Sequence, residues 1–214
     1  MIKKQKLLKT PLGKALKELS EELNNKNMPP VTLNVIGGFA LLLREKRDPE
    51  SITDIDYVGP ELSQEIKDIA TPIGIKYGLG YDWINNDVML CDISMEDFEF
   101  STGGSLNFEK AFSVGKIKIN VLDEIGLLRM KLIAIDTSLC AASNEGEFTR
   151  EKDLPDIVLL MNELNMTTKD LQNEFGGLII EKSTFPMIRL YQAKGSSVVD
   201  DQIEIIANNQ SMEK

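Results

Sequence analysis

The order of four segments between residues 31 and 58 limits the fold of this chain more than any other feature. An apolar run is followed by a glycine pair, a helical stretch and a second β-rich run; these are Val31–Ile36, Gly37-Gly38, Phe39–Lys46 and Ile52–Val58. The last run contains Asp54 and Asp56. Because alternate residues of a strand share one face, this order predicts strand, turn, helix and a strand with two carboxylates on one side.

The two aspartates and the glycine pair could serve one reaction, as ligands of a metal ion and of a phosphate. Two residues apart on a strand, the Cα atoms of Asp54 and Asp56 would lie ~6.6 Å apart, and their carboxylates could converge on one or two hard cations. A Gly-Gly pair at a strand-to-helix turn lets backbone N–H groups approach a phosphate at the positive end of the helix. Gly-Gly alone is usually a turn, and Asp-x-Asp alone is usually a solvated strand end. Their combination in this order favours nucleotidyl or phosphoryl transfer.

Composition excludes several other kinds of chemistry. The 214 residues include no histidine, which removes Ser-His-Asp and Cys-His schemes and most zinc sites. The two cysteines, Cys91 and Cys140, have no metal-type spacing. No apolar run approaches ~18 residues and no apolar region follows the basic N-terminus, so we expect neither a membrane span nor a signal peptide. A reduced, cytoplasmic setting is predicted.

Charge is unevenly distributed along the chain. The net charge is −10, yet the first seventeen residues contain six lysines and no acid. These lysines are Lys3, Lys4, Lys6, Lys9, Lys14 and Lys17. Such a run is either a solvated arm or helix face, or a contact for nucleic acid, whose phosphates bind lysines in a salt-dependent way.

The remaining pattern alternates strands and helices before it becomes helical. Helices are predicted after the Thr10-Pro11 cap, over Glu61–Ala70, from Glu124, from Asp153 to Leu164 and after Thr167-Thr168, and a strand is predicted over Lys116–Leu122. The predicted class is α/β (α+β), with a mixed sheet, flanking helices and a helical C-terminal region. We expect an N-terminal basic segment and helix (1–27), a core (28–123) and a helical region with a polar tail (124–214). The single tryptophan, Trp83, is expected in the core or as a loop anchor or, alternatively, stacked on a base.

Several of these segments resemble a known family. Val35-Ile-Gly-Gly-Phe-Ala-Leu-Leu42, Arg47 and Thr53-Asp-Ile-Asp-Tyr-Val58 resemble the polymerase-β-like nucleotidyltransferase superfamily, and most closely its small bacterial AbiEii-type members, which are toxins of toxin–antitoxin pairs. Leu127-Leu-Arg-Met-Lys-Leu-Ile-Ala134 is similar to that group's Leu-Leu-x-x-Lys-Leu-x-Ala helix. Lys152-Asp-Leu-Pro-Asp-Ile157 is similar to its Arg-Asp-x-x-Asp element. The resemblance covers about residues 31 to 161.

The resemblance implies an activity and partners. The enzyme would transfer a nucleotide from an NTP to a hydroxyl of an RNA (a tRNA 3′ end) or of a protein, and a cognate antitoxin would bind it. Alternative functions are nucleotidyl transfer to an antibiotic, or a catalytically silent relative that binds a nucleotide or a partner.

The resemblance also implies roles for particular residues. Asp54 and Asp56 would bind Mg²⁺ or Mn²⁺. The nucleotide would be bound by Gly37, Gly38, Arg47 and Lys131. Asp153 would orient Lys131 or act as a base. Without that function, Lys131 would extend its ammonium to solvent from an amphipathic helix, and Asp153 and Asp156 would cap a helix.

One departure from the superfamily concerns its third carboxylate. The strand over Lys116–Leu122 has Asn120 where an acid is expected, and Asp92 and Asp123 are alternatives. An asparagine offers an oxygen ligand without charge. Three possibilities follow: a weaker one-metal enzyme, an acid from elsewhere in the chain, or a non-catalytic relative.

Overall fold

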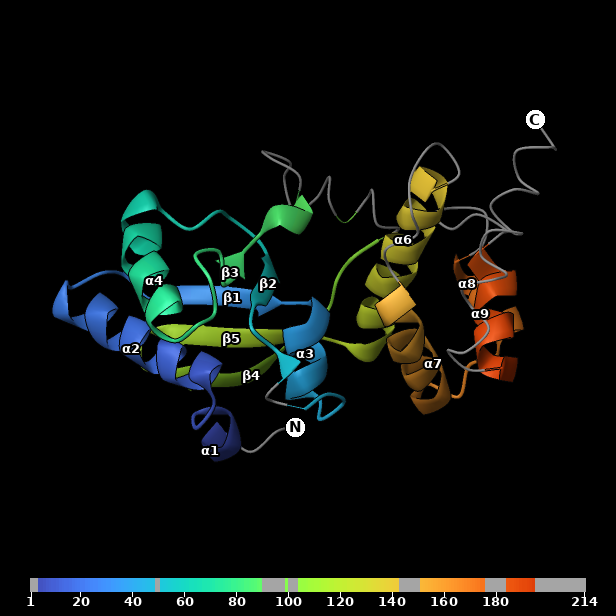
Figure 1. Cartoon of the computed structure of the whole chain (residues 1–214), viewed down its shortest axis with the longest axis horizontal. Helices are drawn as coiled ribbons and strands as arrows, with labels where there is room; N and C mark the ends of the chain where they lie inside the picture. Colours follow the sequence, from blue (N-terminus) through green and yellow to red (C-terminus); the bar gives the residue numbers. More distant parts are fainter. Residues whose placement is uncertain are drawn as a thin grey trace. The chain divides into compact units, whose positions relative to one another are not determined.

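The computed structural model describes residues 4–48, 51–89, 99, 104–142, 151–175 and 184–194. The chain divides into two compact units, Met1–Phe98 with Leu106–Asp123, and Glu99–Ser105 with Glu124–Lys214. The first unit contains a sheet and helices, and the second is helical (Figure 1). A unit boundary falls after residue 123, where the predicted core ends, and the N-terminal segment 1–27 belongs to the first unit.

The described part of the first unit contains a five-stranded mixed sheet in the order β3-β2-β1-β5-β4. The strands are β1 (Val31–Val35), β2 (Ile55–Val58), β3 (Ile84–Asn85), β4 (Phe108–Val114) and β5 (Ile117–Leu122). β1 runs parallel to β5 and antiparallel to β2, β2 runs parallel to β3, and β4 runs antiparallel to β5. This mixed sheet with its helices confirms the predicted α+β class.

The helices described in the first unit are α1 (Lys4–Leu7), α2 (Pro11–Asn25), α3 (Gly37–Leu43), α4 (Gln64–Lys76) and the 3₁₀ turn η2 (Asp87–Met89). Side chains cap the start of two of them, α2 and α4. Thr10 caps α2 as predicted, since its hydroxyl accepts a 3.0 Å hydrogen bond from the Gly13 N–H. The helix predicted over Glu61–Ala70 starts later and ends later, because Ser63 caps it and buried Ile73 continues its apolar face past Pro72.

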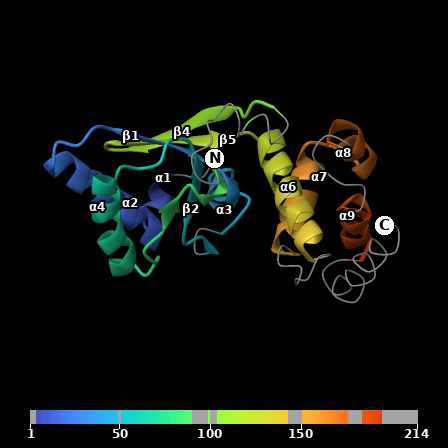
Figure 2. The ribbon, with the colours of Figure 1, turned by 90° about the horizontal axis from the view of Figure 1, so that it is seen from above.

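The strands β1 and β5 each bury one face and leave residues of the other face exposed or half-buried. Odd-numbered residues of β1 and β5 are buried, and α2 and α4 lie on that side of the sheet (Figures 1 and 2). On the opposite face, Thr32 and Lys118 are exposed, and Asn120 donates a 2.9 Å hydrogen bond to the half-buried Asn34. Asn34 pairs with Val58 in the β1–β2 register. Asp56, two residues before Val58, therefore lies on the same face as Asn34, in a part of that face where Val58 is buried.

The second unit contains α6 (Glu124–Ala142), η3 (Glu151–Asp153), α7 (Leu154–Glu163), α8 (Thr168–Phe175) and α9 (Thr184–Lys194). Its core includes Leu128, Ile135, Ile157, Leu171 and Ile188, all fully buried. Among the helices that the structure describes, none is long and apolar enough to cross a membrane.

Trp83 is a core residue of the first unit. Its side chain is 1% exposed, and its indole N–H donates a 2.8 Å hydrogen bond to the Ala70 carbonyl of α4. A Cβ at Gly74 would lie 2.2 Å from the indole Cδ1, so the helix backbone approaches the ring closely. The core placement of Trp83 is therefore the one observed, and stacking of Trp83 on a base does not fit this burial.

We predict that Trp83→Phe lowers the free energy of unfolding by about 1–3 kcal/mol, because it removes a buried hydrogen bond and packed volume. Urea denaturation measures the change. The control is Tyr81→Phe, since the Tyr81 side chain is 69% exposed and its loss of a hydroxyl should change stability by less than about 0.5 kcal/mol. Equal stability of the Trp83→Phe and wild-type proteins would contradict the core role.

Candidate active site

Gly37 brings the start of α3 against the carboxylate of Asp56. Its φ is +61°, in the left-handed region that L side chains rarely adopt, and a Cβ built there would lie 2.6 Å from Asp56 Oδ2. The backbone also connects the two positions, because the Ile36 N–H donates a 3.0 Å hydrogen bond to the Asp56 carbonyl. Glycine is thus required at position 37 for its conformation and for the room that the carboxylate occupies.

Gly38 allows a similar approach by a cation. A Cβ at this position would lie 3.3 Å from Arg47 Nη1 and 3.1 Å from Ile52 Cδ1. The two successive glycines therefore place backbone beside one carboxylate and one guanidinium. The structure brings together four residues that the sequence analysis proposed as site residues: Gly37, Gly38, Arg47 and Asp56.

The first turn of α3 contributes backbone donors more than a helix dipole. Ile36 at the N-cap provides no side-chain hydrogen bond to the helix, and α3 has only seven residues. The partial positive charge at the start of a helix comes from the free N–H groups of its first turn. Phosphate binding would therefore depend on the glycine backbone and on Arg47.

Asp56 is oriented by a residue that the sequence analysis did not propose for the site. Asn85 pairs with Asp56 in the β2–β3 register and donates a 3.3 Å hydrogen bond to Asp56 Oδ1. The position of Asn85 follows from β3, a strand of two residues that leaves no alternating pattern in the sequence. The polar pair Asn85-Asn86 was the one sequence signal at this position.

Asp54 lies outside the strand. The prediction of a strand over Ile52–Val58 is wrong at its start, because the observed strand β2 begins at Ile55. Asp54 therefore belongs to the preceding loop, where it is exposed and makes no hydrogen bond or ion pair with the described part of the chain. Two residues still separate it from Asp56, so both carboxylates come from one short segment.

The register locates the position of a possible third acid. Val35 pairs with Tyr57 on one side and with Val121 on the other, so the β5 residue level with Asp56 is Leu122, which is buried. Asn120 lies two residues earlier on the same face. Asp123 follows β5 and is half-buried, and Asp92 lies outside the described residues. No group of three potential metal-binding side chains (His, Cys, Asp or Glu) occurs among the residues described.

A polar hollow of about 250 Å³ adjoins the site through Asn85. Its lining includes Asn86, Asp82, Asp87 and the ring of Tyr57. Burial raises the pKa of the Tyr57 hydroxyl, which accepts a 3.1 Å hydrogen bond from the Leu62 N–H. These amide, carboxylate and hydroxyl groups could bind the polar edges of a sugar or base.

Lys131, Asp153 and Asp156 form an ion-paired cluster in the second unit. The Lys131 ammonium is hydrogen-bonded to Asp153 Oδ1 and lies 2.9 Å from Asp156 Oδ2. The three side chains are only 11%, 1% and 9% exposed, respectively. Lys131 therefore does not extend to solvent, and Asp153 precedes α7 without a side-chain capping bond. The cluster joins α6 to the start of α7.

The sequence-proposed site residues thus fall into two groups. Gly37, Gly38, Arg47, Asp54 and Asp56 belong to the first unit, and Lys131 and Asp153 belong to the second. A phosphate-binding role for Lys131 and a base role for Asp153 stay predictions.

Comparison of the chain with protein-family models, with curated proteins and with solved structures gives no match. A functional proposal for this protein therefore depends on the resemblance of its motifs and on the geometry of its side chains.

We predict that Gly37→Ala destabilises the protein more than Gly78→Ala. Gly78 has φ +71° with open space around its Cα, so alanine there costs only the left-handed conformation, about 1–2 kcal/mol. At position 37 the same cost is added to displacement of the Asp56 carboxylate. Urea denaturation of both variants measures the difference, and equal losses would show that the contact with Asp56 is unimportant.

We predict that Lys131→Met lowers the free energy of unfolding by about 3–5 kcal/mol, because two buried carboxylates lose their counter-charge. The triple variant Lys131→Met/Asp153→Asn/Asp156→Asn should recover at least half of that loss. Thermal and urea unfolding test both. The cluster would have no structural role if the single variant were as stable as the wild type.

Proposed function

We propose that this chain is a divalent-metal-dependent nucleotidyltransferase, which transfers a nucleotide from an NTP to a hydroxyl of an RNA 3′ end or of a protein. The observation that carries the proposal is the contact of Gly37 with the Asp56 carboxylate, beside Gly38 and the Arg47 guanidinium. A site for phosphate and a site for a metal would then share one backbone turn. This combination suits a magnesium-bound triphosphate.

Asp54 and Asp56 are the proposed metal ligands. Their carboxylates are the hard oxygen donors that Mg²⁺ and Mn²⁺ prefer, and Asn85 orients one of them. A bound Mg²⁺ would neutralise phosphate charge and align the α-phosphorus for in-line attack. Exposed Asp54 can adjust to an ion, whereas half-buried Asp56 is held by the sheet.

The glycine backbone and Arg47 would bind the triphosphate, with Arg47 providing the planar donors suited to phosphate oxygens. In the reaction, an acceptor hydroxyl oxygen bonds to the α-phosphorus as the bond to the β-phosphate oxygen breaks. Pyrophosphate leaves, and a carboxylate of the site takes up the hydroxyl proton. The resemblance to toxin relatives suggests that the activity arrests growth and that a cognate antitoxin restrains it.

A catalytically silent nucleotide-binding protein is the second candidate. The observation that favours it is the Asn120–Asn34 hydrogen bond, which engages the amide at the predicted third-acid position. Leu122, level with Asp56 on β5, supplies no charge either. Such a protein would bind Mg²⁺ and NTP without transferring a nucleotide.

We predict that Asp54→Asn and Asp56→Asn each reduce nucleotide transfer at least a hundredfold, because each removes a charged metal ligand. Each labelled NTP is incubated with Mg²⁺ and total RNA or cell lysate, and label on the acceptor is measured. Asp68→Asn is the matched control, since Asp68 is an exposed acid of α4 in the same unit. Transfer that persists in the Asp54→Asn and Asp56→Asn proteins would exclude the proposed mechanism.

Binding and transfer together separate the two candidates. NTP at a hundred times its dissociation constant should stabilise the protein by about 2.7 kcal/mol in either case. Stabilisation without any transfer, to RNA, protein or an antibiotic panel, would favour the silent binder.

A further inference from the structure

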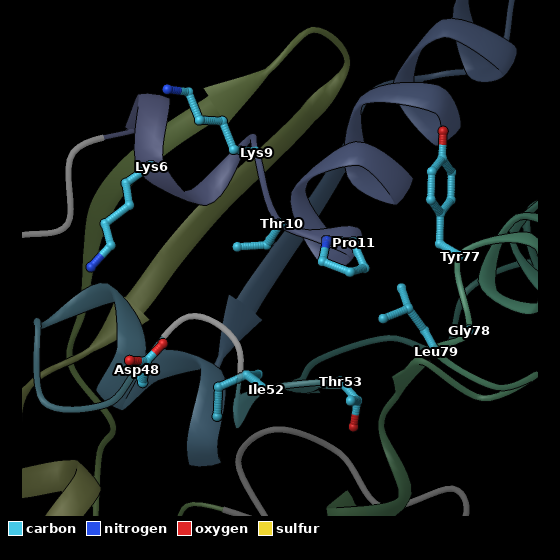
Figure 3. A pocket seen from close by; sticks show the side chains of 10 residues that line it. All are labelled: Lys6, Lys9, Thr10, Pro11, Asp48, Ile52, Thr53, Tyr77, Gly78 and Leu79. Atoms are coloured by element: carbon cyan, nitrogen blue, oxygen red, sulfur yellow. The ribbon is translucent and has the colours of Figure 1, made fainter.

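The first unit contains a second, larger cavity of about 690 Å³ (Figure 3). Residues from three segments far apart in the sequence line it: 6 and 9–11, 48 with 52 and 53, and 77–79. Its volume is that of a typical small-molecule site. The functional proposal above uses none of the side chains that line it.

One end of this cavity is cationic. Lys6 and Lys9 line it, both are exposed, and neither ammonium group forms a hydrogen bond or ion pair with the residues that the structure describes. Asp48 is the single acid among the lining residues. The lining therefore has a net positive charge in a protein whose net charge is −10, which favours an anionic ligand at this location.

The other end presents an aromatic ring that is fixed in position. The Tyr77 hydroxyl donates a 2.8 Å hydrogen bond to Glu18 Oε2, which also lies 2.6 Å from the Lys76 ammonium. The hydrogen bond from Lys76 lowers the pKa of Glu18, so this carboxylate stays ionised as an acceptor. Because the hydroxyl is bound to α2, the ring remains beside Leu79 and the cavity (Figure 3). A fixed ring and an aliphatic wall suit a planar apolar group.

The wall between the two ends continues into the proposed active site. Ile52 lines the cavity and also lies at the Gly38 backbone, where a Cβ would be 3.1 Å from its Cδ1. Thr53 lines the cavity and directly precedes Asp54. A molecule in the cavity would therefore lie next to the segment that contains the proposed metal ligands.

We propose that this cavity binds a nucleoside phosphate, with its base against Tyr77 and its phosphate beside Lys6 and Lys9. In the proposed transferase this nucleotide is the end of the acceptor, and its hydroxyl is directed towards Asp54. This assignment of the bound nucleotide rests on the proposed function. The same chemistry is offered by a free mononucleotide and by the end of a single strand.

Titration calorimetry without Mg²⁺ tests the cavity separately from the metal site. The probes are the four 5′-mononucleotides and their single-stranded tetranucleotides, with nucleosides and inorganic phosphate as controls. Lys6→Gln/Lys9→Gln should weaken binding about tenfold and flatten its dependence on salt. Lys14→Gln/Lys17→Gln removes the same charge from the same basic segment outside the cavity lining, and should bind as the wild type does.

The outcomes distinguish this inference from the proposed function. Tighter binding of a tetranucleotide supports a strand end as the ligand, and equal binding of a mononucleotide supports a free nucleotide. Binding by Lys6→Gln/Lys9→Gln that equals the wild type, or preference for an acidic peptide over every nucleotide, overturns the inference and leaves the transferase intact. Transfer that persists in Asp54→Asn/Asp56→Asn protein, with cavity binding retained, overturns the proposed metal-dependent mechanism alone.

Discussion

The contact between the Gly37 backbone and the Asp56 carboxylate is the constraint on which the proposed site depends. A Cβ there would lie 2.6 Å from a carboxylate oxygen, and the neighbouring Ile36 N–H bonds to the Asp56 carbonyl. The β1–β2 pairing and the orientation of this carboxylate are therefore coupled. Any larger residue would have to move an anion away from the turn where phosphate binding is proposed, so the glycine permits both the turn conformation and the close approach of the carboxylate.

Long, periodic segments of the chain were predictable because local pattern determines them. The strand β1 and the helices α2, α6 and α7 follow from apolar spacing and cap residues. The strand β3 has two residues and β4 contains an irregularity between Lys110 and Phe112, so neither shows a clean alternation. The helix α9 lacks a single apolar face and was also missed. The strand β3 depends on pairing with β2, and α9 depends on packing against other helices of the second unit, which the local sequence does not encode. The strand β4 forms a hairpin with the adjacent β5, and its irregularity hides the alternation.

The same distinction applies to the site. The glycine pair and Asp56 are brought together because strand, turn and strand are neighbours in sequence and in space. Asn85 reaches Asp56 only through the β2–β3 register, and Asn120 is offset from it by the β1–β5 register. Both relationships require knowledge of which residues pair across the sheet. A motif gives residue types and spacing, but it does not give the register in which one strand pairs with another.

The acids of this chain differ in what their removal would reveal. Asp153 and Asp156 are buried against Lys131, so their substitution alters folding before it can report on chemistry. Asp54 is exposed and has no polar partner within the described ranges, and exposed unpaired carboxylates contribute little to stability. Asp54 lies two residues from Asp56, which Asn85 orients, so its substitution would test the proposed metal site with little effect on the fold. Asp54 is accordingly the position at which function can be separated most clearly from stability.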